Sequence, residues 1–446
     1  MALKPMFYTE AVRQIQRAPR PVFVQLTAEF RVPKGKFSPW KVVNFDQEKD
    51  FVKGFMETSF LEVLMVLEQY RQYVYPHRND LKVDLKRIVV GELQGGIIKS
   101  LPPTLRTYRA VLLENTDPGL LGQNSMSGLA QVSGTQTFVN VKFQLIPIEF
   151  DKLQYVRFGG PYVNSTPGDL LKCLLTQAIS QTKGLENERL KGLEFVTPDN
   201  KTVRKQINIQ HGVELYNLPG YLQKHGGGIY NNDIGIFSHR QLLYVYPLYD
   251  TTRYNKSKYA VDFYIIPRNQ VITERTYDVK NDRVTVVITG AVKHFDFSDQ
   301  KQTSEGNGAM FSVATKQFNE FVKVENGVGV LQPDKTAATV QVQERESKLN
   351  NAPMLQRRVT DNIARELSKL SARKGQLAHF VWNDADPELL VPGMPMRIFY
   401  QGPQGLVEGY GTVLGVEAYT ALERPGFTTE TYQTTASVMV YFIPKT

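Results

Sequence analysis

Histidine and cysteine are the residue types that most often build metal sites and nucleophilic centres, and this chain has few of either. The single cysteine, Cys173, excludes a disulfide within the chain and any multi-cysteine metal site, and it indicates a reducing compartment. No two histidines are four residues apart, and no HExxH motif occurs, so a zinc site is not indicated. The sequence therefore predicts no metal and no cofactor. The histidines are His77, His211, His225, His239, His294 and His379.

Three short motifs suggest catalytic or ligand-binding loops, and each is incomplete. HGGG (225–228) resembles the oxyanion loop of some lipases and esterases, but the required G-x-S-x-G elbow is absent, so a glycine turn after a short helix is favoured. GYGTVLG (409–415) and GNG (306–308) lack the full G-x-G-x-x-G pattern of a nucleotide loop. NDADPE (383–388) lacks the glycine and distal glutamate of a calcium loop and is interpreted as an acidic turn. No enzyme is predicted, although a hydrolase whose carboxylates meet only in the fold remains an alternative.

Aromatic residues are abundant, with 22 Tyr and 24 Phe. The stretch LLYVYPLYD (242–250) places Tyr244 and Tyr246 on a predicted strand. Two interpretations stay open: ordinary sheet packing, or a protein–protein interface, where tyrosine and arginine are favoured. A predicted basic helix, 352–375, carries Arg357, Arg358 and Arg365 and is either a solvated face or a partner-facing one.

The bulk composition is that of a globular protein. A chain of 446 residues with 41% hydrophobic and 22% charged residues predicts two to four domains with sizeable cores. The net charge of +9 permits nucleic-acid contact without requiring it, so a sheet-based nucleic-acid-binding protein is kept as an alternative. No apolar run approaches the roughly 18 residues of a membrane span, and the first residues lack the apolar core of a signal peptide.

Periodicity divides the chain into an N-terminal arm (1–20) and three predicted domains. Residues 21–160 read as an antiparallel β domain, because LKVDLKRI (81–88) alternates and 22–32, 106–114 and 135–150 are typical of strands. The apolar run 60–76 favours neither helix nor strand.

Residues 161–260 are predicted to form a small α+β domain. Its helix over 165–180 begins with Thr166 as a cap, and Cys173 adjoins the apolar stripe as a small core residue. Residues 261–446 return to β structure, with strands at 258–267, 283–297 and 337–344 and with the helix 352–375.

The order of these features resembles the baseplate hub proteins of contractile-tailed bacteriophages, which are related to the hub portion of type VI secretion spikes. The stretches that carry the resemblance are QYVYPHRNDLKVDLKRI (72–88), RTYRAVLLENTDP (106–118), VKFQLIPIEFDKL (141–153), STPGDLLKCLL (165–175) and LPGYLQKHGGGIYNNDIGIFSHRQLLYVYPLYD (218–250).

The resemblance implies a mainly β fold with an α+β insertion: two antiparallel β-barrels of the tail-tube type and a smaller intervening domain. It implies a structural virion protein of the phage tail baseplate, assembled in the host cytoplasm. Such a hub forms a homotrimeric, pseudo-sixfold ring that joins the tail tube to the central spike and surrounds the DNA-ejection channel. Implied partners are the tail-tube, central spike, baseplate wedge and tape-measure proteins. A tail-tube initiator is the nearest alternative.

The C-terminal segment is predicted to be the last hairpin of the second barrel. Pro392 and Gly393 form the turn entering a strand on which Met394, Met396, Ile398 and Tyr400 share one face. QGPQG, with Gly402 and Gly405, is the hairpin turn, and Gly409, Gly411 and Gly415 mark bends or close approaches. Residues 434–444 then close the sheet.

Overall fold

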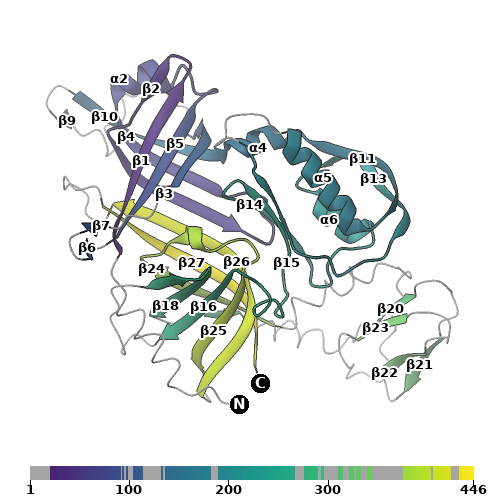
Figure 1. Cartoon of the computed structure of the whole chain (residues 1–446). Coiled ribbons are helices and arrows are strands. Elements are labelled where there is room, and N and C mark those ends of the chain that lie inside the picture. The colour runs from purple at the N-terminus through teal and green to yellow at the C-terminus, as the bar shows by residue number, and fades with distance from the viewer. Residues whose placement is uncertain are drawn as a thin grey trace.

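The computed structural model of the chain is mostly β (Figure 1). The residues that it describes pack into three hydrophobic cores. It describes residues 21–91, 93–94, 97–98, 104–113, 132–133, 136–181, 189–266, 276–289, 293–295, 310–314, 321–325, 328–332, 339–343, 375–402, 405–422 and 431–445. The predicted arm (1–20) and the basic helix with Arg357, Arg358 and Arg365 lie outside these residues.

The first β core is enclosed by a strand path that returns to its start. The order is β26-β3-β4-β10-β8-β5-β1-β27, where β26 is Gly405–Leu422 and β27 is Tyr432–Pro444. Because β27 pairs again with β26, these eight strands form a closed circuit around the core. The junction of β1 with β27 consists of one pair, Val24 with Tyr432. The strands of this region are β1 (Pro21–Val32), β2 (Gly35–Phe37), β3 (Lys41–Asp50), β4 (Thr58–Val66), β5 (Lys82–Gly91), β6 (Leu93–Gln94), β7 (Ile97–Ile98), β8 (Thr104–Leu112), β9 (Val132–Ser133) and β10 (Gln136–Pro147).

The second β core uses the same two long strands. β26 (Gly405–Leu422) pairs with β25 along its first half and with β3 along its second half, while β27 (Tyr432–Pro444) pairs with β26 throughout and with β24. The sheet continues to β17 at one end and β19 at the other. The remaining strands here are β16 (Ala260–Ile266), β17 (Tyr277–Lys280), β18 (Arg283–Thr289), β19 (Lys293–Phe295), β24 (Gln376–Asn383) and β25 (Pro395–Gly402), with a 3-10 turn η4 (Pro387–Leu389).

The expectation that this second sheet is antiparallel throughout is wrong at β16. This strand runs parallel to both β18 and β25. Every residue of β16 is buried, as is typical of parallel strands covered on both faces. Alternation in a sequence reports which face is buried and carries no information on strand direction. The lack of alternation in AVDFYII, which is apolar except for Asp262, was a usable sign of a strand buried on both faces.

The third core belongs to an α+β unit that contains helices α5 and α6 (Figure 1). Thr166 caps α5 as expected, because its Oγ1 accepts a hydrogen bond of 3.0 Å from the Asp169 backbone N–H. Cys173 is exposed, so the expectation of core packing is wrong for this residue. The elements are α4 (Ile148–Leu153), β11 (Arg157–Ser165), α5 (Pro167–Gln181), β12 (Gly192–Phe195), β13 (Arg204–Glu214), α6 (Leu218–His225), β14 (Ile234–His239) and β15 (Leu242–Pro247).

The β14–β15 hairpin separates the third core from the second. On β15, Leu243 and Val245 pack in the third core, while Tyr244 and Tyr246 point to the second. Tyr246 is buried, and its hydroxyl donates a 2.8 Å hydrogen bond to the Phe51 carbonyl. Of the two interpretations left open for Tyr246, the structure favours sheet packing over a partner interface, because its ring lies inside the chain. Tyr244 is half-buried against the same core.

The remaining segments refine the sequence-based boundaries. The ambiguous run 60–76 is a strand followed by a short helix, since β4 ends at Val66 and is followed by α2 (Leu67–Gln69) and the π-helical η1 (Tyr70–Val74).

HGGG is a turn after α6, with φ of +103° at Gly227 and +80° at Gly228. Two further two-stranded sheets pair β20 (Met310–Ala314) with β23 (Thr339–Gln343) and β21 (Phe321–Glu325) with β22 (Val328–Gln332).

Candidate functional site: a buried ion-pair network where three cores meet

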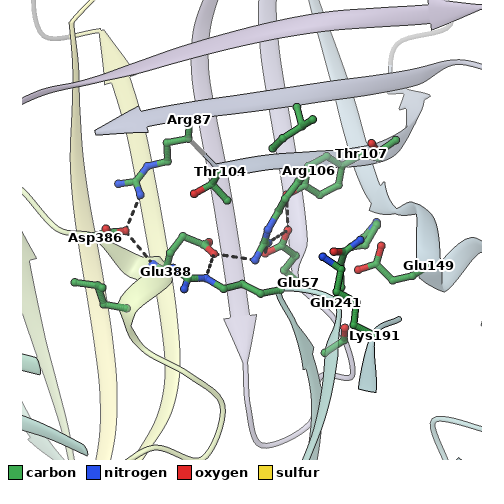
Figure 2. Close-up of a pocket in the computed structure, with 16 residues that line it drawn as sticks. Glu57, Arg87, Thr104, Arg106, Thr107, Glu149, Lys191, Gln241, Asp386 and Glu388 are labelled. Atoms are coloured by element: carbon green, nitrogen blue, oxygen red, sulfur yellow. Dashed lines mark hydrogen bonds and ion pairs between the residues drawn. The ribbon is translucent and has the colours of Figure 1, made fainter. Parts of the chain in front are cut away.

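Charged side chains converge at the place where the three cores meet. A cavity of about 490 Å³ is lined by residues of β5, β8, β14, η4 and the connections beside them (Figure 2). In the close-up, Arg87 and Arg106 point from the first β core toward Asp386 and Glu388 of the second. Lys49, on β3, reaches the same network from the protein interior.

Glu57 and Arg106 form the half of the network that belongs to the first β core. Arg106 Nη1 lies 2.9 and 2.8 Å from the two carboxylate oxygens of Glu57. The Tyr108 hydroxyl donates to Glu57 Oε1 at 2.7 Å. Both oxygens of this buried carboxylate are therefore engaged, which offsets the cost of removing its charge from water.

Glu388 joins the first core to the second. Its Oε1 accepts a 2.6 Å hydrogen bond from Lys49 Nζ, and its Oε2 accepts one of 2.8 Å from Arg106 Nη2. Arg240, which follows β14, places its Nε 3.6 Å from the same Oε2 and thereby brings in the α+β unit. One carboxylate thus contacts side chains from two other parts of the molecule.

Asp386 fixes the local structure that presents Glu388. It precedes η4, and its Oδ1 accepts a hydrogen bond of 3.3 Å from the Glu388 backbone N–H. The same Oδ1 accepts a 2.6 Å hydrogen bond from Arg87 Nη1. Capping and ion pairing together hold the 3-10 turn against the first β core.

The electrostatics keep the Glu388 carboxylate ionised. Burial alone would raise the pKa of Glu388, but the charges of Arg106 and Lys49 hold that pKa well below its ordinary value. Burial lowers the pKa of His239 well below its ordinary value, despite the nearby Glu388, so the imidazole is neutral. Its Nε2 lies 3.2 Å from the Glu388 carbonyl oxygen.

This arrangement is suited to holding structure together. A general acid needs a carboxyl with a raised pKa, whereas the pKa of Glu388 is lowered and its oxygens are occupied. Within the described ranges no group of three or more His, Cys, Asp or Glu could hold a metal ion. Long, apolar helices able to span a membrane are likewise absent from the part of the chain that the structure describes.

Sequence reasoning missed this network almost entirely. NDADPE was interpreted as a turn, and the structure places a turn there, with φ of +49° at Asp384. The burial of Asp386 and Glu388 was not foreseen, nor was the pairing of Lys49 with a residue 339 positions away. The one available signal was the position of two carboxylates directly before the apolar LLVPGM.

The turn residues predicted for the C-terminal hairpin lie where the sequence placed them. Gly393 has φ of +63° and directly abuts Tyr246, and Gly402 pairs with Gly405 across the hairpin. A Cβ on Gly409 would lie 2.5 Å from the Phe442 ring, and one on Gly411 would lie 1.7 Å from the Tyr441 carbonyl oxygen. Pro392 is buried beside this turn.

The chain is similar to solved structures of phage tail and type VI secretion proteins. A tail protein from Neisseria meningitidis matches 93% of this chain and 96% of its own, with 11% identity and a TM-score of 0.42. A prophage 43 kDa tail protein from Shewanella oneidensis matches 92% and 98%, with 10% identity and a TM-score of 0.44. An Escherichia coli type VI secretion component, described as structurally similar to phage T4 tail proteins, matches 94% and 77%, with 11% identity and a TM-score of 0.40. No protein-family model and no curated protein matches the sequence.

Proposed function

We propose that this chain is a baseplate hub of a contractile tail, a structural protein that forms a homotrimeric ring between the tail tube and the central spike. The observation that carries the proposal is the shared use of β26 and β27 by two β cores. A hub must present two β units from each of three chains as six positions of one ring. Strands that run through both cores fix the spacing of the two units.

The ion-pair network supports the same function. Lys49, Arg87 and Arg106 hold η4 of the second core against the first, and Arg240 adds the α+β unit. A ring that transmits force during contraction needs subunits whose parts do not shift. Buried, geometrically specific ion pairs are suited to fixing one arrangement, at some cost in stability relative to apolar packing.

The mass of the assembled protein tests this proposal. Native mass spectrometry of the full chain should give three times the chain mass of 50.7 kDa, and negative-stain images should show a ring with threefold symmetry. A sixfold assembly would instead favour the tail-tube initiator. A protein that stays monomeric at micromolar concentration and above would contradict both.

An edge strand offers a sharper test of ring closure. β17 pairs only with β18 among the described strands, and its Val279 is 46% exposed. We propose that this edge meets the neighbouring subunit, so Val279→Lys should dissociate the trimer without unfolding the chain. The matched control is Val163→Lys on β11, where the valine is 66% exposed and lies on the α+β unit. Equal effects of the two substitutions would exclude β17 as the contact.

The partners of such a hub are the tail-tube, central spike, baseplate wedge and tape-measure proteins, and DNA passes through the ring during ejection. These assignments rest on the resemblance of the sequence to hub proteins. Co-expression with a candidate spike protein and a candidate tube protein, followed by affinity purification, would test each contact separately. The virion tail is then the expected location of the assembled protein.

A further inference from the structure

The cavity beside the ion-pair network opens to solvent between the first β core and the α+β unit. Its inner wall is formed by buried groups such as Glu57, Asp386 and Glu388. Its outer lining includes the exposed Lys191 and Leu105, the latter 51% exposed. A solute can therefore reach the buried charges, because the mouth carries side chains that solvent already contacts.

One buried donor in this cavity has no hydrogen-bond partner among the residues that the structure describes. Arg87 donates through Nη1 to Asp386, but its Nη2 is buried and makes no hydrogen bond. Its side chain is only 12% exposed, and Arg87 lines the cavity together with Thr104 (Figure 2). A buried guanidinium nitrogen without an acceptor is unfavourable, and such groups are normally satisfied by water or by a ligand.

The charge balance of the cavity favours an anion. Asp386, Glu57 and Glu388 already accept hydrogen bonds from arginine or lysine. Glu149 lies on the other side of the cavity from Arg87, near Gln241 and Lys191 (Figure 2). Counting the network and the lining together, five cationic side chains face four carboxylates, which leaves one positive charge in excess. The cations are Lys49, Arg87, Arg106, Lys191 and Arg240, and the carboxylates are Glu57, Glu149, Asp386 and Glu388.

We propose that this cavity binds one oxyanionic group, a carboxylate or a phosphate, between Arg87 and Arg240, with Thr104 as a further donor. Arg240 is suited to this role because its side chain is 46% exposed and its Nε lies 3.6 Å from Glu388 Oε2, which is longer than a strong hydrogen bond. Arginine prefers such groups because its planar fork matches two oxygens at once. The bound group would contact the first β core and the α+β unit together, and its binding would stabilise the folded chain.

Thermal unfolding and calorimetric titration of the full chain test this site with two probes, inorganic phosphate and N-acetyl-aspartate methylamide. We expect at least one probe to raise the unfolding temperature saturably, beyond the effect of sodium chloride at equal ionic strength. The tighter probe identifies the source, a phosphate or a carboxylate side chain. If neither probe exceeds sodium chloride, the cavity holds water and the proposal is overturned.

Three variants tie the effect to these residues. Arg240→Gln should weaken binding about tenfold, the change expected on losing one charge-assisted hydrogen bond. Arg87→Lys keeps a charge beside Asp386 and removes the second donor, so binding should weaken while the fold is retained. Arg157→Gln is the control, because that side chain is 62% exposed and pairs with Glu214 on the α+β unit. Should Arg87→Lys fail to fold, Arg240→Gln decides alone, and unchanged affinity in it would refute the site.

Discussion

Lys49 is a fully buried lysine, and its environment explains why it is tolerated. Its Nζ lies 2.6 Å from Glu388 and 3.9 Å from Glu57, so two carboxylates compensate a charge that has left water. Nothing in the sequence around Lys49 indicated this role, because the residue types along a strand can indicate a buried face but do not name a partner. For every other member of the network, too, the sequence does not indicate the ion-pair partner.

Replacing Lys49 with methionine should destabilise the chain by about 3–5 kcal/mol, because two buried carboxylates then lose a shared cation. Denaturant-induced unfolding measures the change. The matched control is Lys36→Met, since Lys36 is 58% exposed and its 2.9 Å pair with Glu29 lies at the surface. The control should cost no more than about 1 kcal/mol. Similar losses in both variants would mean that the buried network contributes little.

His239 gives the network a dependence on pH. Burial lowers the pKa of His239, so the unfolded chain binds a proton near pH 6.5 that the folded chain rejects. The effect of His239 on the free energy of unfolding is therefore constant above pH 6.5. Below pH 6.5 the free energy of unfolding decreases as the pH falls, by at most about 1.4 kcal/mol per pH unit. Loss of the Glu388 charge acts in the same direction but only below its ordinary pKa of 4.5.

Between pH 7 and pH 5, His239→Gln should flatten the decline in unfolding free energy. Glutamine keeps a donor for the Glu388 carbonyl oxygen and does not titrate. His225→Gln serves as the control, because it makes the same replacement at an exposed histidine, at the end of α6. Parallel curves for wild type and His239→Gln over this range would show that His239 is not the group responsible.

At the scale of the element, the sequence correctly predicted features that depend only on neighbouring residues, such as strand alternation and helix capping. The alternation in 81–88 and the cap at Thr166 are confirmed as β5 and the start of α5. Cys173 was misplaced because it borders the apolar stripe of α5 by one position, which is enough to turn it toward solvent. The run 60–76 could not be resolved because it contains a strand and a helix in sequence, so no single period fits it.

Gly411 on β26 should not tolerate a side chain. An added Cβ would lie 1.7 Å from the Tyr441 carbonyl oxygen of the neighbouring strand, and backbone cannot yield as a flexible side chain does. We expect Gly411→Ala to cost about 3 kcal/mol, the upper part of the range for overpacked positions. Gly220→Ala, in α6 with open space around it, should instead stabilise by about 0.5–1 kcal/mol. Unfolding midpoints of both variants check the signs, and a neutral Gly411→Ala would contradict the close approach.

At the scale of the whole molecule, the arrangement depends on contacts between distant segments. β27 contributes Tyr432 to the first core and Phe442 to the second, and the composition of this strand does not reveal that it serves both. Likewise, Tyr244 and Tyr246 were expected to be packing or interface residues, and the structure uses them as packing between two parts of one chain. A sequence specifies such residues as apolar without specifying which core receives them.

The three cores should unfold together, in a single calorimetric transition. Neither β core can unfold alone without breaking pairs along β26 and β27, and the α+β unit is held by the β14–β15 hairpin. Tyr246→Ala should split the transition in two, because it removes the ring that joins the α+β unit to the second core together with the 2.8 Å bond to Phe51. Leu243→Ala, on the opposite face of β15, should lower the unfolding temperature and preserve one transition, since Leu243 packs only within the third core. Two transitions in the unaltered protein would show that the shared strands do not couple the units, and a rigid double-core subunit would then be excluded.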